Sequence, residues 1–166
     1  MITKKEISIV IPVYKSKNIL YKLYNEIDSA LKNYIYEVIL VNDNSPDDSW
    51  NEILKLCENN SHIIGVNLRK NFGQDAAIMA GLNQTSGKYI VIMDDDLQHS
   101  PFDIEKLYLE CKKGYDVCYA NFKKKKQSWW KNMGSWFNGK VAEYILDKPP
   151  DMETLTYQMQ IDFQTR

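Results

Sequence analysis

Three consecutive carboxylates, Asp94, Asp95 and Asp96, are the residues of this sequence best suited to chemistry. They directly follow an unbroken apolar run, residues 89–93, which is typical of a buried parallel strand. Neighbouring carboxylates repel one another unless something positive binds between them. Oxygen-only ligands suit Mg²⁺ or Mn²⁺ shared with a substrate's phosphates, so the triplet predicts a divalent metal site. The alternative is a solvated acidic turn before the helix expected from Pro101.

Further candidates lie at the ends of other expected strands. They are Pro12, Val13, Tyr14, Asp43, Arg69, Lys70, Asn71 and Gly73. Tyr14 could stack on a base, and Asp43 could accept hydrogen bonds from a base or ribose. Arg69 and Lys70 precede a helix N-terminus, where phosphate binds favourably. Each also has an ordinary structural explanation: a packed strand-end aromatic for Tyr14, an Asx turn for Asp43 and solvated charges for the two cations.

Strands and helices alternate along the chain. Apolar runs predict strands at 7–14, 38–41, 63–66, 89–93 and 116–119, and helical spacing of apolar residues predicts helices at 18–32, 50–58, 74–84 and 101–113. This order predicts an α/β fold, a mostly parallel sheet with helices on both faces. Ligands of such sheets bind beyond the carboxyl ends of the strands, so the candidates above should meet at one edge.

This edge would combine a hydrogen-bond acceptor for a nucleotide base, cations for phosphate and a metal site. Such a combination predicts a pocket for a nucleotide diphosphate. The sequence has no GxGxxG after the first expected strand, which argues against a dinucleotide-binding fold. It also has no GxxxxGK[ST], so it is not a P-loop NTPase.

Composition narrows the class further. The chain has 166 residues, 44% of them hydrophobic, which predicts one globular domain with a real core. A net charge of −1 gives no general argument for nucleic-acid binding. Three cysteines without CxxC spacing indicate reduced thiols in a cytosolic protein. We expect no signal peptide and no membrane-spanning helix, since no apolar run reaches about 18 residues.

Together these residues resemble the family 2 glycosyltransferases with the GT-A fold, and within them the polyprenyl-phosphate branch similar to dolichol-phosphate-mannose synthase. The resemblance runs in register from about residue 7 to about residue 152. It implies a Rossmann-like nucleotide-sugar-binding domain over 1–152 with an incomplete acceptor half, followed by a divergent, poorly ordered tail over 153–166. The matching stretches are Ile9-Val10-Ile11-Pro12-Val13-Tyr14, Val41-Asn42-Asp43-Asn44-Ser45-Pro46-Asp47, Arg69-Lys70-Asn71-Phe72-Gly73-Gln74, Ala80-Gly81-Leu82 and Met93-Asp94-Asp95-Asp96-Leu97-Gln98-His99-Ser100-Pro101.

The resemblance also implies roles for individual residues. Asp94, Asp96 and Gln98 are expected to hold Mg²⁺ or Mn²⁺, with Arg69 or Lys70 assisting the departing nucleotide diphosphate. Two positions depart from the common family pattern. Asp95 stands where a small residue is usual, and Lys15 stands where Asn followed by an acid is usual. The expected donor contacts are Pro12, Val13, Tyr14, Asp43, Asn71, Asp95 and Lys123.

The function implied is inverting transfer of a sugar from a nucleotide-diphosphate-sugar to a polyprenyl (undecaprenyl) phosphate. UDP is the expected nucleotide and GDP the second candidate. A lipid phosphate is already anionic and hardly needs a general base. Two alternatives stay open at this point: transfer to a sugar hydroxyl in cell-surface polysaccharide synthesis, and a catalytically inactive nucleotide- or membrane-binding fragment.

Residues 123–137 form the one strongly basic and aromatic stretch. Four consecutive lysines begin it, and Trp129, Trp130, Trp136 and Phe137 follow at helical spacing. This pattern predicts contact with a membrane surface, and hence a cytoplasmic protein peripheral at the inner face of the cell membrane. The alternative is a solvated lysine loop followed by a helix packed on the sheet. An incomplete acceptor half would expose apolar surface, which favours membrane contact or a homo-oligomer.

Overall fold

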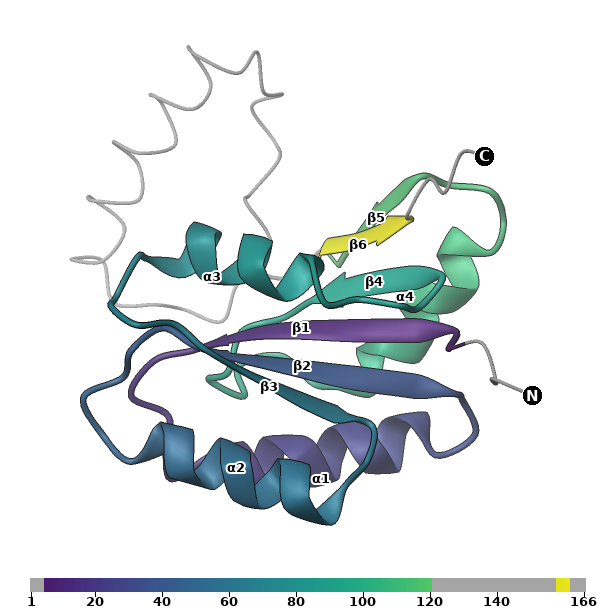
Figure 1. The fold of residues 1–166 in the computed structure, drawn as a ribbon. Helices are drawn as coiled ribbons and strands as arrows, with labels where there is room; N and C mark the ends of the chain where they lie inside the picture. Colours follow the sequence, from purple (N-terminus) through teal and green to yellow (C-terminus); the bar gives the residue numbers. More distant parts are fainter. Residues whose placement is uncertain (1–4, 121–157, 162–166) are drawn as a thin grey trace, which may run out of the picture. The chain divides into compact units, whose positions relative to one another are not determined.

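The computed structural model describes residues 5–120 and 158–161, and Figure 1 shows their arrangement. Nine of the ten elements agree with those predicted from the sequence, with ends that differ by a few residues. In chain order the elements are β1 (Ile7–Val13), α1 (Leu20–Leu31), β2 (Tyr36–Asn42), α2 (Ser49–Asn59), β3 (Ile63–Asn67), α3 (Gln74–Leu82), β4 (Tyr89–Ile92), α4 (Asp103–Cys111), β5 (Val117–Tyr119) and β6 (Gln158–Ile161).

The strands of the described residues form one sheet in the order β3-β2-β1-β4-β6-β5. β1 pairs in parallel with β2 and with β4, and β2 pairs in parallel with β3. Every residue of β1, β2 and β4 is buried, which explains why these strands are almost continuously apolar in sequence. The parallel strands bring the ends of β1, β2 and β4 to one edge.

β6 is the element that the sequence did not predict. We expected a poorly ordered tail over 153–166, but residues 158–161 form a strand that pairs antiparallel with both β4 and β5. The sequence Gln-Met-Gln-Ile alternates polar and apolar residues, a period-two pattern too short to stand out among polar neighbours. Its strand conformation depends on pairing with distant segments. The other tail residues lie outside the described ranges.

Helices cover both faces of the sheet, as predicted. α1 contacts α2 and α4, whereas α3 packs on β1 and β2 from the opposite side (Figure 1). On α1 the buried residues recur every three or four positions, because this spacing places them along one side of a helix. They are Leu20, Leu23, Ile27 and Leu31. No helix in the ranges 5–120 and 158–161 is long and apolar enough to cross a membrane.

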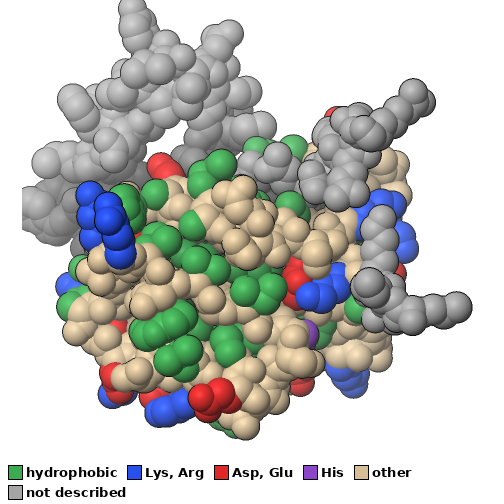
Figure 2. Space-filling view, in the orientation of Figure 1, with side chains coloured by type: hydrophobic (Ala, Val, Ile, Leu, Met, Phe, Trp, Pro, Cys, Tyr) green, Lys and Arg blue, Asp and Glu red, His purple; other side chains and the backbone are tan. Residues whose placement is uncertain are grey.

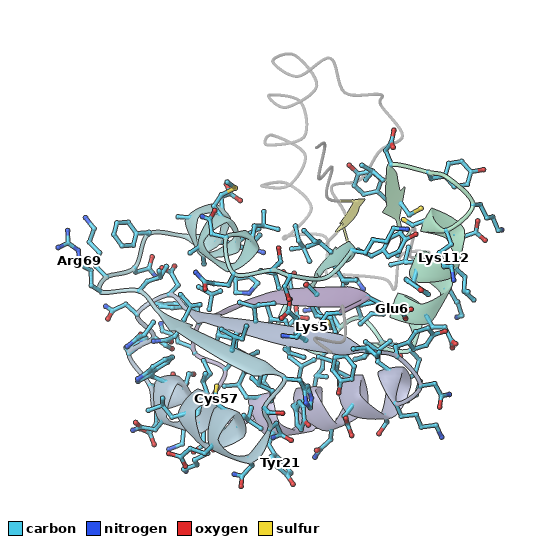
Figure 3. All side chains as sticks on the ribbon, turned by 45° about the vertical axis from the view of Figure 1, so that its right-hand side comes forward. Lys5, Glu6, Tyr21, Cys57, Arg69 and Lys112 are labelled. Atoms are coloured by element: carbon cyan, nitrogen blue, oxygen red, sulfur yellow. The ribbon has the colours of Figure 1, made fainter. Side chains whose placement is uncertain are left out.

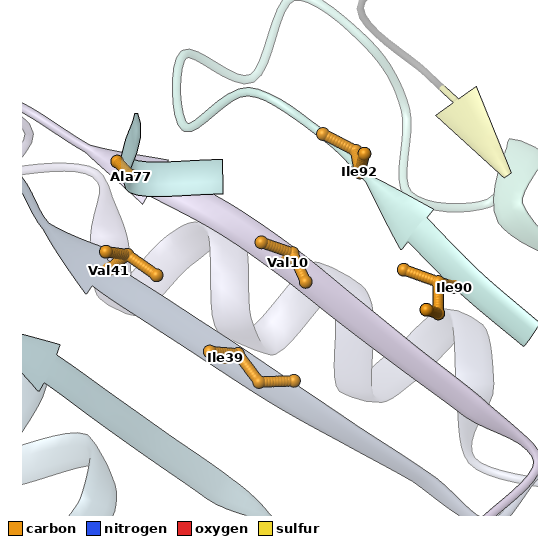
Figure 4. Packing of buried hydrophobic residues seen from close by; sticks show 6 residues of the cluster. All are labelled: Val10, Ile39, Val41, Ala77, Ile90 and Ile92. Atoms are coloured by element: carbon orange, nitrogen blue, oxygen red, sulfur yellow. The ribbon is translucent and has the colours of Figure 1, made fainter. Parts of the chain in front are cut away.

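Where α3 meets the sheet lies an apolar cluster built from β1, β2, β4 and α3 itself (Figure 4). Its buried members are Val10, Ile39, Val41, Ala77, Ile90 and Ile92. Partly buried apolar residues of β3 and α3, Ile64 and Ile78 among them, surround this cluster. Hydrophobic side chains are accordingly visible between α3 and β3 in Figure 2. Because α3 is packed on this cluster, its first residue is fixed in place, and so is the end of the loop that precedes it.

Gly81 allows the close contact between α3 and the sheet. A Cβ atom at this position would lie 2.4 Å from Val10 Cγ1 and 3.0 Å from Val41 Cγ2. We expect Gly81→Ala to lower the free energy of unfolding by about 1–2 kcal/mol in urea titration, because overpacking outweighs the better helix propensity of alanine. The exposed Ala76 on the same helix is the control, since Ala76→Ser should change stability by less than about 0.5 kcal/mol. Equal stability of the two variants would contradict this packing.

Candidate active site

A cavity of about 330 Å³ opens where β1, β2 and β4 end and α3 begins. Eight of the residues predicted to contact donor or metal line it, together with two to which we had assigned no contact. The predicted residues are Pro12, Val13, Tyr14, Asp43, Asn71, Asp94, Asp95 and Asp96. The additional ones are Gly73 and Gln74. The strand-end rule therefore gathers the candidates at one edge, as expected.

The backbone turns sharply at this edge. Among the described residues, three that are not glycine have a positive φ: Lys15 at 61°, Asn44 at 50° and Leu97 at 56°. They follow β1, β2 and β4 respectively. Asparagine tolerates this left-handed conformation, but lysine and leucine adopt it only where surrounding contacts compensate. The strained positions thus lie in the loops that form the cavity.

Lys15→Asn should relieve one of these strained positions. We expect the free energy of unfolding to rise by about 0.5–1 kcal/mol, because asparagine adopts the left-handed conformation at lower cost. Thermal unfolding measures the change. Lys17→Asn in the same turn serves as the control, since Lys17 is not among the residues with positive φ and should gain nothing. A gain of the same size at Lys17 would show that strain at Lys15 is not the cause.

Asp43 is buried and holds the loop before α3. Its Oδ1 accepts the Phe72 N–H at 2.8 Å, and its Oδ2 accepts the Gly73 N–H at 2.9 Å. Gly73 has a φ of 91°, a conformation that favours glycine and brings the chain into α3. We predicted that Asp43 accepts hydrogen bonds from a base or ribose. Its observed partners are backbone amides, and a contact with ligand stays a prediction.

Asp94 and Asp96 have different partners. Asp94 Oδ1 accepts the Gln74 Nε2–H at 2.8 Å, and Asp96 Oδ1 accepts the Gln98 N–H at 2.9 Å. The latter bond closes the turn in which Leu97 has its positive φ. Gln98, which we predicted as a metal ligand, is exposed and contacts Asp96 through its backbone; its side chain is not among the cavity-lining residues.

Asp95 points toward the turn that follows β1. Its Oδ2 accepts the Tyr14 N–H at 3.1 Å and also the Ser16 hydroxyl. Burial raises the pKa of Asp95 above its ordinary value, although these two hydrogen bonds act in the opposite direction. The middle acid of the triplet therefore differs from its neighbours in its hydrogen-bond partners.

Two further candidates, Arg69 and Lys70, are described by the structure and do not line the cavity. Arg69 is exposed and extends away from the sheet (Figure 3). Lys70 is also exposed, with its Nζ 4.8 Å from the centroid of the Phe72 ring. Loop direction is not encoded in residue type, which is why the sequence could not place these two cations. Lys123 lies outside the described residues, as does the whole basic and aromatic stretch 123–137.

A second polar group supports the cavity and was not predicted. Asp47 Oδ1 accepts hydrogen bonds from Ser45 Oγ at 2.6 Å, Ser49 Oγ at 2.5 Å and the Ser49 N–H at 3.1 Å. Although burial acts to raise it, these bonds lower the pKa of Asp47 to about 2. The signal in the sequence is the density of Ser and Asp directly after the strand expected at 38–41.

The carboxylates of the cavity suit a hard divalent cation. Within 5–120 and 158–161, no group of three or more His, Cys, Asp or Glu side chains is arranged to hold a metal ion. Asp94 and Asp96 would therefore provide part of a coordination shell, with the rest from phosphate oxygens and water. Mg²⁺ and Mn²⁺ are commonly bound in this way, so the donor set fits them.

Fold and cavity together define an α/β domain with an acidic ligand pocket at the carboxyl edge of its sheet. A sequence model of the family described as Glycosyl transferase family 2 matches residues 8–164. The chain belongs to glycosyl transferase family 2.

The relatives include two enzymes from Yersinia. The undecaprenyl-phosphate 4-deoxy-4-formamido-L-arabinose transferase of Yersinia pestis (strain Pestoides F) is 45% identical over 117 residues. The protein of the same name from Yersinia enterocolitica serotype O:8 is 46% identical over 117 residues. Both matches cover 68% of this chain and 36% of the relative, so the chain spans about a third of the relatives' length.

Solved structures confirm the predicted GT-A fold. Glucosyl-3-phosphoglycerate synthase from Mycobacterium tuberculosis, solved with Mn²⁺, UDP-glucose and phosphoglyceric acid, has a TM-score of 0.70 and 16% identity over 95% of this chain and 56% of its own. The mannosyltransferase PcManGT from Pyrobaculum calidifontis, solved with GDP-Man and Mn²⁺, has a TM-score of 0.66 and 15% identity over 95% of this chain and 45% of its own.

Proposed function

We propose that this chain forms the donor-binding part of a metal-dependent, inverting glycosyltransferase that transfers a sugar from a nucleotide-diphosphate-sugar to a polyprenyl phosphate. One observation carries the proposal. Asp94 and Asp96 line the same cavity as Tyr14 and Asp43. Acids suited to a divalent metal, a ring that can stack on a base and a hydrogen-bond acceptor are thus within one pocket.

Each lining residue has a use in this reaction. Asp94 and Asp96 would hold Mg²⁺ or Mn²⁺, and the bound ion would supply positive charge to the leaving nucleotide diphosphate. Tyr14, which is 45% exposed, offers an aromatic surface to the base. Asn71 offers an amide to the ribose or phosphates. We retain Gln98 as a third metal ligand and Arg69 as a cation for the diphosphate only as predictions.

The relatives support a lipid-phosphate acceptor and a location at the membrane. They are named undecaprenyl-phosphate 4-deoxy-4-formamido-L-arabinose transferases, and undecaprenyl phosphate is an anion that can attack without a dedicated general base. We therefore propose undecaprenyl phosphate as the acceptor and the inner face of the cell membrane as the location, with residues 123–137 in contact with lipid. Solved neighbours carry UDP-glucose in one case and GDP-Man in another, so UDP and GDP are both candidate nucleotides.

Two measurements on the full 166-residue chain test this proposal. Calorimetric titration with UDP and with GDP, each with and without Mn²⁺, should show metal-dependent binding of one nucleotide. Transfer from the corresponding labelled nucleotide-sugar should then favour undecaprenyl phosphate over oligosaccharide acceptors. Transfer to oligosaccharides alone would support a sugar-hydroxyl acceptor instead. Binding without any transfer would indicate an inactive nucleotide-binding fragment, and no binding would contradict the proposal.

A further inference from the structure

The turn between β1 and α1 is held in an unusual way. Four consecutive backbone N–H groups, from residues 14 to 17, donate to side chains of two distant segments. Tyr14 N–H donates to Asp95 Oδ2 at 3.1 Å, Lys15 N–H to Ser45 Oγ at 2.7 Å, Ser16 N–H to Ser49 Oγ at 3.1 Å and Lys17 N–H to Asp47 Oδ2 at 3.2 Å. We call these four acceptors the amide clamp.

Two carboxylates form the ends of the amide clamp. The hydroxyls of Ser45 and Ser49 accept from the turn and donate to Asp47 Oδ1. A hydroxyl bonded to a carboxylate is a stronger acceptor for an amide, because hydrogen bonds in a chain polarise one another. On the other side, Asp95 receives both the Tyr14 amide and the Ser16 hydroxyl. The turn is therefore held between an acid after β4 and an acid after β2.

The clamp occupies the groups that such a turn could offer to phosphate. In many α/β folds the amides after the first strand bind phosphate. Here the amides of residues 14–17 already have side-chain partners within the protein. Lys15 keeps its positive φ of 61° in this arrangement, which its neighbours' hydrogen bonds compensate. The turn thus presents the Tyr14 ring to the cavity and not an anion-binding backbone.

We propose that Asp95 is a positioning residue that fixes the Tyr14–Lys17 turn at the cavity wall and does not ligate the metal. This inference rests on the proposed function in one respect: the cavity wall that Asp95 positions is taken to bind the nucleotide. The three adjacent acids contact three different segments. Asp94 contacts Gln74 at the start of α3, Asp96 contacts its own turn, and Asp95 contacts the turn after β1.

Amide hydrogen exchange, followed by NMR on the full chain without ligand, tests the positioning role. In Asp95→Ala, exchange at Tyr14 should accelerate about tenfold, because its amide loses its acceptor, Asp95. Exchange at Ser16, whose amide donates to Ser49 Oγ, should accelerate with it because the Ser16 hydroxyl loses Asp95 as its acceptor. Asp95→Asn retains an acceptor oxygen and should stay within about threefold of the wild type. Asp96→Ala is the matched control and should leave these amides unchanged. Unchanged exchange in Asp95→Ala would overturn the proposal. If that variant does not fold, Ser16→Ala should accelerate the same exchange, and its failure to do so counts equally against the proposal.

Metal and nucleotide titration separates positioning from ligation. In Asp95→Asn the dissociation constant of Mn²⁺ in the presence of UDP or GDP should stay within about threefold of the wild type, whereas Asp95→Ala should weaken nucleotide binding about tenfold. A loss of Mn²⁺ binding in Asp95→Asn as large as that in Asp96→Ala would make Asp95 a ligand and overturn the proposal. If the wild-type chain binds neither nucleotide, the proposed function fails, and hydrogen exchange alone still decides the role of Asp95.

Discussion

Asp96→Ala should weaken Mn²⁺-dependent nucleotide binding by at least about 100-fold, the largest effect we expect for a single residue of the cavity. Its carboxylate lines the cavity, and its Oδ1 is held by the Gln98 N–H at 2.9 Å. Removal takes a full negative charge from beside a divalent cation, and nearby water cannot replace that charge. Calorimetric titration of UDP and GDP with and without Mn²⁺ measures the loss.

The control for this prediction is an acid outside the cavity. Asp103 lies in the first turn of α4 and pairs with Lys106 at 2.6 Å, a contact between a partly exposed acid and an exposed lysine that contributes little. Asp103→Ala should therefore bind nucleotide as the wild type does. Metal-independent binding in the wild type, or equal binding by Asp96→Ala, would remove the metal from the proposed mechanism.

Local pattern predicted the fold because the central strands are buried throughout. A strand covered on both faces must be apolar at nearly every position. β1, β2 and β4 were therefore recognisable from their own sequences, without knowledge of the strands they pair with. β6 was not, because its four residues become a strand only by pairing with β4 and β5. The sequence separation between residues 92 and 158, which pair across β4 and β6, leaves no local signal.

The same distinction applies to the candidate site. Strand ends are local features, and they predicted eight residues of the cavity. Partners are not local. Asp43 accepts hydrogen bonds from backbone amides 29 and 30 residues away in the sequence, and Asp95 accepts one from an amide 81 residues away. Residue type alone identified carboxylates at the edge of the sheet, but it could not separate those that support a loop from those positioned to bind a ligand.

The second large effect concerns stability and lies at the other end of the sheet. Glu37 of β2 is fully buried, with a side chain that is 0% exposed. It pairs with Lys5 and accepts the Ser8 hydroxyl at 2.6 Å and the Ser86 N–H at 2.6 Å. Ser8 in turn accepts the Gly87 N–H at 2.8 Å. This network joins β1, β2 and the loop before β4.

Glu37→Ala should lower the free energy of unfolding by about 3–5 kcal/mol. The substitution leaves the Ser8 hydroxyl and the Ser86 amide without their acceptor, and it leaves Lys5 without its counter-charge. Glu37→Gln keeps the shape and one acceptor oxygen, so it should lose less, about 1–3 kcal/mol. Urea titration at neutral pH measures both, with the exposed Glu58→Gln of α2 as a control that should stay within about 0.5 kcal/mol of the wild type. A small effect of Glu37→Ala would mean that the network is dispensable.

The contribution of Glu37 should also depend on pH. Burial acts to raise its pKa, but hydrogen bonds from Lys5, Ser8 and Ser86 outweigh burial and hold the pKa below the ordinary value of 4.5. A carboxyl group whose pKa is lower in the folded state stabilises the fold fully above its unfolded pKa, and this stabilisation is lost as the pH falls through the folded pKa. The stability difference between wild type and Glu37→Gln should therefore be constant near neutral pH and shrink below about pH 4.5. A difference that stays constant throughout acid titration would show that the charge of Glu37 does not contribute to folding.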